Sequence, residues 1–114
     1  MKVEILMAIQ SGNKFTNKKS RWAYKTYRER WYRVLGLYLP PCKTARPDVK
    51  VKVKIVSVRA RYLDRVNMAQ GAKPILDHLK KMGYIRDDSP RWLDDSYDQV
   101  IDKGNQRTII TIEG

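Results

Sequence analysis

Three aspartates and one lysine in the second half of the chain are residue types used in metal-dependent phosphate chemistry. Asp87 and Asp88 are adjacent. Asp64 lies upstream of them, and Lys73 lies between. Carboxylates beside a bound phosphate repel it unless a divalent cation bridges the two groups, and Mg²⁺ fits because it takes one or two carboxylates and keeps water ligands. A metal-bound water is then the nucleophile, and the lysine orients it or stabilises the developing charge.

The same residues have simpler structural interpretations, which the sequence leaves open. Asp87 and Asp88 begin an Asp-Asp-Ser-Pro segment, whose composition also suits a solvated turn. Lys73 stands four residues before Asp77, at the spacing of an ordinary ion pair on a helix. Three further aspartates would either supply metal ligands or form a solvated acidic face: Asp94, Asp95 and Asp98.

The distribution of charge indicates the partner of such a site. The 114 residues include 24 Lys or Arg and 12 Asp or Glu, for a formal net charge of +12. Residues 1–61 hold 16 basic and 3 acidic side chains, a balance of +13, whereas residues 62–114 hold 8 and 9, a balance of −1. Basic side chains that neutralise phosphates release condensed counterions, which drives sequence-independent nucleic-acid binding. The first half of the chain is therefore predicted to bind a nucleic acid.

Two basic segments are candidates for the nucleic-acid contact. One is a basic ridge at three- and four-residue steps: Lys18, Arg21, Lys25 and Arg28. The other is one side of an alternating strand: Lys50, Lys52 and Lys54. Aromatic residues interleaved with the ridge could stack on unpaired bases, although Tyr27 and Trp31 fall on the stripe expected to face the core. The strand lysines could also be a solvated face, but a row of like charges is unfavourable without an anionic partner.

Length and composition are those of a single globular domain spanning residues 1–114. No apolar stretch approaches the ~20 residues of a membrane span, and the amino terminus does not have the pattern of a signal peptide. The sequence therefore predicts a soluble, cytoplasmic protein. The chain has one cysteine, Cys42, which excludes an intrachain disulfide. It has one histidine, His78, so a zinc site made of several cysteines or histidines is also excluded within one chain.

The first half is predicted to contribute two strands and a helix to the scaffold of these sites. Residues 3–9 are apolar and short, as a first strand would be. Residues 18–37 carry apolar side chains at helical spacing. Residues 50–60 begin with a clean alternation of lysine and aliphatic residues, which predicts a half-buried strand.

The second half is predicted to complete an α+β domain. Residues 68–82 form the apolar side of a second helix, which Gly83 ends and in which Pro74 lies near the beginning. Residues 97–101 and 108–112 are predicted to close the fold as a hairpin. The resulting β-α-β-α-β-β order predicts a small mixed sheet with two main helices.

Four short segments carry a more specific pattern. They are Asp64-Arg65-Val66-Asn67-Met68, Gly71-Ala72-Lys73-Pro74, Asp77-His78-Leu79 and Gly83-Tyr84-Ile85-Arg86-Asp87-Asp88-Ser89-Pro90-Arg91-Trp92. Together they resemble the RusA-type Holliday-junction resolvases, particularly those of phages and prophages. The resemblance covers about a quarter of the chain, and the amino-terminal half agrees only in general character.

The resemblance implies a RusA-like homodimer that binds four-way DNA junctions and cuts them in recombination and repair. It implies Mg²⁺ as the cofactor, with Mn²⁺ as the alternative ion. By position, Asp64 is the first aspartate of an Asp-x-Asp-Asn motif and Asn67 is its asparagine. Lys73 corresponds to the catalytic lysine, and Asp88 to the aspartate that follows the helix.

One position departs from the resemblance. Val66 stands where the family has its second aspartate, and its hydrocarbon side chain cannot ligate a metal. Asp64 and Asp88 would then hold the ion, with Asp87 or Asn67 as substitute oxygen donors. A helix over residues 71–82 rises ~18 Å, and residues 84–88, if extended, can return ~16 Å, so Asp88 could fold back towards Asp64. Otherwise a dimer partner would have to complete the site.

Three functions are consistent with these patterns. The first is a Mg²⁺-dependent, structure-selective endodeoxyribonuclease that acts on branched DNA as a homodimer. The second is a non-catalytic branched-DNA-binding relative, in which the change at Val66 has impaired or abolished cleavage. The third is a basic RNA-binding or assembly protein with no active site.

Overall fold

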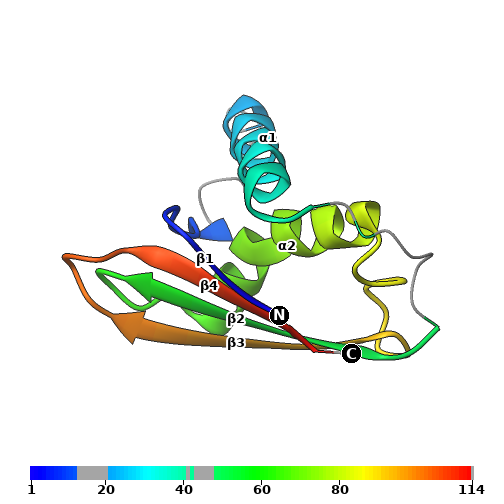
Figure 1. Ribbon diagram of the computed structural model, residues 1–114. Helices are drawn as coiled ribbons and strands as arrows, with labels where there is room; N and C mark the ends of the chain where they lie inside the picture. The colour runs from blue at the N-terminus through cyan, green and yellow to red at the C-terminus, as the bar shows by residue number, and fades with distance from the viewer. Residues whose placement is uncertain (13–20, 41, 43–47, 114) are drawn as a thin grey trace.

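A computed structural model describes residues 1–12, 21–40, 42 and 48–113. The elements in chain order are β1 (Lys2–Ile5), α1 (Arg21–Tyr38), β2 (Val51–Arg59), α2 (Arg65–Met82), β3 (Leu93–Ile101) and β4 (Arg107–Glu113). The strands form one sheet, and both helices lie on the same side of it (Figure 1). The predicted α+β class and β-α-β-α-β-β order are confirmed. Neither helix of the described part combines the length and apolar character of a membrane span.

The order of the strands in the sheet differs from the prediction. The order is β1-β4-β2-β3, in which β4 is antiparallel to both β1 and β2 and β3 is parallel to β2. The predicted hairpin of residues 97–101 and 108–112 is therefore wrong, because β2 separates these strands. Burial explains the arrangement: β4 buries Thr108, Ile110 and Ile112, whereas β3 buries only Leu93. The more apolar strand occupies the inner position, and the acidic strand lies at the edge.

The core lies between the sheet and the two helices. Val51, Val53 and Ile55 of β2 are buried, while the intervening lysines point to the other side, as the alternation predicted. Helix α1 buries Tyr27 and Trp31 against this core, so the interpretation of both as packing residues is confirmed. The first strand is shorter than predicted, since β1 ends at Ile5.

Helix α2 begins earlier than its apolar pattern predicted. It runs from Arg65 to Met82 and ends at Gly83, which has a φ of 90° and donates to the carbonyl groups of the last turn. Pro74 consequently lies inside the helix, and its predicted place near the beginning is wrong. The proline leaves the carbonyl of Gln70 without its intrahelical donor. Its buried ring nevertheless adds to the apolar side that faces the core.

Candidate nucleic-acid interface

A cleft of about 490 Å³ lies between α1 and α2. Its described lining, which we call the basic cleft, consists of Gly12, Arg21, Tyr24, Lys25, Arg28, Gln70 and Lys73. Four of these side chains are cationic, and no carboxylate is among the described residues of the lining. The cleft therefore concentrates positive charge contributed by two helices.

Close packing at Gly71 fixes the walls of the basic cleft. The Tyr27 hydroxyl donates to the carbonyl of Gly71 at 2.6 Å and accepts from the backbone N–H of Gln10 at 3.1 Å. A Cβ on Gly71 would overlap the carbonyl oxygen of Gln10 and lie 2.8 Å from Cγ2 of Ile9. Helix α1, helix α2 and the segment after β1 are thus locked together at one point, beside the cleft.

The basic ridge lies along the α1 side of this cleft. Arg21, Lys25 and Arg28 all line it, whereas the fourth member of the ridge, Lys18, falls outside the described residues. Helix α1 carries five basic residues and one acidic residue, a balance of +4 over its length. Lys73 joins the ridge from α2, so the structure groups the predicted catalytic lysine with the predicted DNA contacts.

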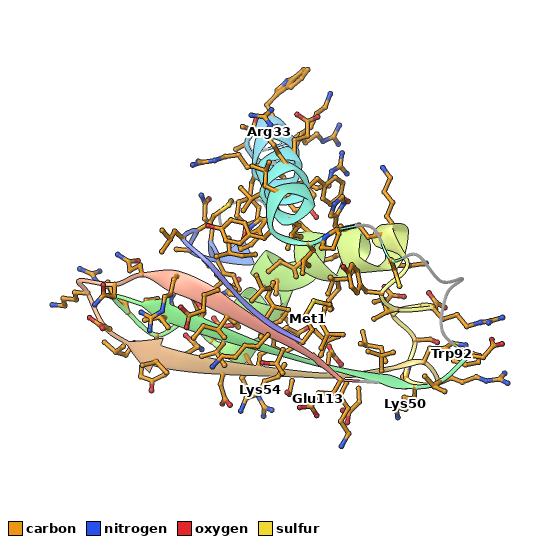
Figure 2. All side chains as sticks on the ribbon, viewed as in Figure 1. Met1, Arg33, Lys50, Lys54, Trp92 and Glu113 are labelled. Carbon is orange, nitrogen blue, oxygen red and sulfur yellow. The ribbon has the colours of Figure 1, made fainter. Side chains whose placement is uncertain are left out.

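The three strand lysines lie in a different electrostatic environment. Figure 2 shows Lys54 and Glu113 on the side of the sheet that faces away from the helices. Lys54 Nζ is 3.5 Å from an Asp98 carboxylate oxygen, and Lys52 pairs in register with Asp94 on one side and Glu113 on the other. The anionic partners that a row of lysines needs thus come from the neighbouring strands. This arrangement favours the interpretation of Lys50, Lys52 and Lys54 as a solvated face of mixed charge.

Asp64 is the N-cap of α2. One carboxylate oxygen accepts from the backbone N–H of Asn67 at 2.9 Å, and the other accepts from the Asn67 side-chain amide at 2.6 Å. These two hydrogen bonds hold the pKa of Asp64 below its ordinary value, with the backbone N–H as the larger cause. Leu63, the residue before Asp64, is held by the side-chain amide of Gln99. This amide accepts from the backbone N–H of Leu63 and donates to its carbonyl, each at 2.8 Å.

Asp87 is engaged at the other end of α2. Its carboxylate lies 3.0 Å from Lys80 Nζ and accepts from the backbone N–H of Asp88 at 2.9 Å. The bond from the Lys80 side chain is the larger cause of a pKa below the ordinary value for Asp87. Asp88 itself is exposed. This pair has the character of the solvated turn that the composition allowed.

The structure does not bring Asp88 back to Asp64 within one chain. The 16 residues from Asp64 to Lys80 correspond to about 24 Å of helix axis. Beyond α2 the chain runs to the start of β2, where Val51 donates to the carbonyl of Trp92 at 3.0 Å, whereas Asp64 follows the end of that strand. The sequence left this return open on the basis of a helix over residues 71–82, whereas α2 begins at Arg65 and is correspondingly longer.

Lys73 lies away from Asp64, and Val66 lies close to it. Lys73 follows Asp64 by nine residues, which is about 13 Å along the helix and half a turn around it. Among the described residues no salt bridge joins it to Asp77, so the ion-pair interpretation is not realised. Val66 lies beside the cap and is 65% exposed, while the neighbouring Asn67 is buried.

The structure does not gather these predicted Mg²⁺ ligands in one place within one chain. Both oxygens of Asp64 are engaged by Asn67, Asp87 is paired with Lys80, and the two carboxylates lie at opposite ends of α2. In the part of the chain that the structure describes, no three His, Cys, Asp or Glu side chains are grouped as metal ligands.

Two substitutions of Asp64 test its role as the N-cap of α2. Asp64→Ala removes both acceptors and is expected to lower the Tm by a few degrees. Asp64→Asn keeps one acceptor for the backbone N–H of Asn67 but loses the one for the Asn67 side-chain amide, so an intermediate Tm is expected. Because the pKa of Asp64 is lowered, its contribution is complete above about pH 4, the ordinary unfolded value, and is lost as the pH falls through the folded value. Thermal melts from pH 2 to 7 test this; a variant order that is the same at every pH would contradict it.

Two residues of the basic cleft were not singled out from the sequence. Gly12 and Gln70 belong to segments far apart in the chain, and only the fold brings them together. The three-residue spacing of Gln70 and Lys73 does place them on one side of a helix. The capping function of Asp64 also had a signal, namely an aspartate immediately before an apolar helical pattern.

The chain was also compared with known proteins. No protein-family model matches it, and the search of curated proteins found no match. The geometry of the basic cleft and the resemblance of residues 64–92 therefore carry the functional argument.

Proposed function

We propose that this protein is a RusA-like, branched-DNA-binding protein whose basic cleft holds the DNA backbone. The observation that carries the proposal is the meeting of Arg21, Lys25, Arg28 and Lys73 in one cleft without a carboxylate in its described lining. Cations placed in this way neutralise phosphates and release their counterions. The guanidinium groups add bidentate hydrogen bonds to phosphate oxygens.

The structure favours binding over catalysis in a single chain. Asp64 is committed to a helix cap, Val66 has no ligating atom, and Asp88 lies at the far end of α2. Lys73, which the resemblance makes a catalytic residue, instead contributes a cation to the cleft. The proposed function is therefore recognition of a DNA branch, with cleavage impaired.

A metal-dependent endonuclease is the second candidate, and one observation favours it. Asp64 and Asp88 are both exposed and stand at opposite ends of the same helix. In a homodimer with twofold symmetry and antiparallel α2 helices, Asp64 of one chain would face Asp88 of the partner subunit, and the reverse pair would form at the other end. Mg²⁺ or Mn²⁺ held there would neutralise the charge of a phosphodiester and activate water.

A cleavage assay separates the two candidates. Labelled four-way junction is incubated with Mg²⁺ and the natural chain, Val66→Asp or Asp88→Asn, and binding is measured in parallel. The natural chain is expected to bind without cutting. Val66→Asp is expected to fold with about 0.3–1 kcal/mol of added stability, since a carboxylate in the first turn interacts favourably with the helix dipole.

Each outcome of the assay has a distinct meaning. Cutting by the natural chain that Asp88→Asn abolishes would overturn the non-catalytic proposal and establish the second candidate. Cutting gained only in Val66→Asp would show that the missing carboxylate is what impairs the natural chain. Absence of binding to any DNA at low salt would contradict both candidates.

A further inference from the structure

Tyr24 gives the basic cleft an aromatic wall. Its ring is half-buried, packs against the core and also lines the cleft. The Arg28 guanidinium lies 5.9 Å from the centre of the ring, within cation–π range. An aromatic ring flanked by cations is the arrangement by which proteins hold single-stranded nucleic acid, because every base has a face that stacks.

Cations from both helices surround the space beside this ring. Arg21 and Lys25 stand one turn apart on α1, and Lys73 lines the same cleft from α2. A phosphodiester strand passing through the cleft would meet positive charge from two directions. No carboxylate is among the described residues of the lining; Asp77, one turn after Lys73 on α2, acts electrostatically on Tyr24 from outside it.

Gln70 adds a group that can recognise a base edge. Its side-chain amide has both donors and an acceptor. A Cβ on Gly12 would overlap the Gln70 Oε1 atom, so the glycine leaves room for this amide at the cleft. The lining thus combines a stacking surface, phosphate-binding cations and a hydrogen-bonding amide.

The size of the cleft favours a small unit of nucleic acid. About 490 Å³ lies within the range of ~300–1,000 Å³ that is typical of small-ligand sites. Paired bases in a duplex are stacked on one another and present no free face to a tyrosine in a cleft. A base that is already unpaired reaches such a pocket at the lowest cost.

We propose that the basic cleft binds one unpaired nucleotide of a DNA strand, with its base against Tyr24 and its phosphates on Arg21, Lys25 and Lys73. This inference rests on the proposed DNA-binding function and identifies the feature of a branched substrate that the protein recognises. Selectivity for branched DNA then arises from unpaired nucleotides at the branch.

Binding titrations test this assignment. Fluorescence anisotropy is measured for Tyr24→Leu, Tyr24→Phe and Lys25→Gln with a short single strand, a blunt duplex of the same sequence and a four-way junction. Tyr24→Leu is expected to weaken binding to the single strand and the junction about tenfold, since the stacking partner is lost. It should leave duplex binding and the salt slope unchanged, and Tyr24→Phe should bind like the natural chain. Lys25→Gln should reduce the single-strand salt slope by about 0.7, as expected for one lost phosphate contact.

A cross-linking measurement on the natural chain makes the test independent of how the variants fold. A single strand that carries 5-iodouracil at one position is irradiated in complex with the protein, and the attached peptide is identified by mass spectrometry. Attachment at Tyr24 is expected. Attachment only outside the basic cleft, or equal single-strand affinity for Tyr24→Leu and the natural chain, would overturn the inference while leaving DNA binding intact. Absence of binding to all three DNA probes at low salt would instead overturn the proposed function.

Discussion

Replacement of Gly71 by alanine is expected to destabilise the protein by about 3 kcal/mol. Residue 71 is where α2 approaches the segment after β1, and an added Cβ would overlap the carbonyl oxygen of Gln10. Backbone cannot move aside as the end of a flexible side chain can. Relief of the overlap would also disturb the hydrogen bonds through which Tyr27 joins Gly71 and Gln10. The substitution therefore acts on the packing that holds the basic cleft together.

Chemical denaturation of Gly71→Ala and Gly36→Ala measures this effect with a matched control. A Cβ at Gly36 would meet nothing within 4 Å, and the residue is exposed on α1. Alanine there should stabilise the protein by about 0.5–1 kcal/mol, because glycine is a poor helix former. Equal free energies of unfolding for the two variants would contradict the close approach at Gly71.

A triple substitution in the basic cleft is expected to remove most of the DNA affinity. Arg21→Gln, Lys25→Gln and Lys73→Gln together delete the three cations of the cleft that are assigned to phosphates. Each phosphate contact contributes about 0.9 to the slope of log K against log[salt], so the slope should fall by about 2.7. At low salt the affinity for a four-way junction should drop by about two to three orders of magnitude. Junction titrations over a salt series measure both quantities.

The parts of the fold that depend on local periodicity were predictable from the sequence. The alternation at the start of β2 placed Val51 and Val53 inside and the lysines outside, and the helical spacing in α1 placed Tyr27 and Trp31 in the core. Strand pairing is not local. The segments that became β3 and β4 have a turn between them and alternate enough for a hairpin, but β4 is more apolar and takes the inner position next to β2.

In the candidate site, too, the features that depend on local spacing were predictable and those that depend on the fold were not. The basic residues of α1 were identified by their spacing, and the structure places three of them on one cleft. Whether Asp88 returns to Asp64 depends on where α2 begins. The sequence estimate used a helix over residues 71–82, whereas α2 begins at Arg65 with a polar cap and first turn that the apolar pattern does not mark. The family resemblance places Lys73 with the aspartates as a catalytic residue, whereas in the structure Lys73 lines the cleft between α1 and α2.

Two triple variants with the same loss of charge test whether the basic cleft is the DNA-binding surface. One is the cleft variant, and the other is Lys50→Gln, Lys52→Gln and Lys54→Gln, which changes a face that includes the Lys54–Asp98 ion pair. Junction binding is titrated for both over the same salt series. We expect the cleft variant to lose about 2.7 in slope and the strand variant to retain the slope of the natural chain. Equal losses in both variants would show that net charge alone drives binding, and a loss confined to the strand variant would place the DNA on the opposite side of the sheet.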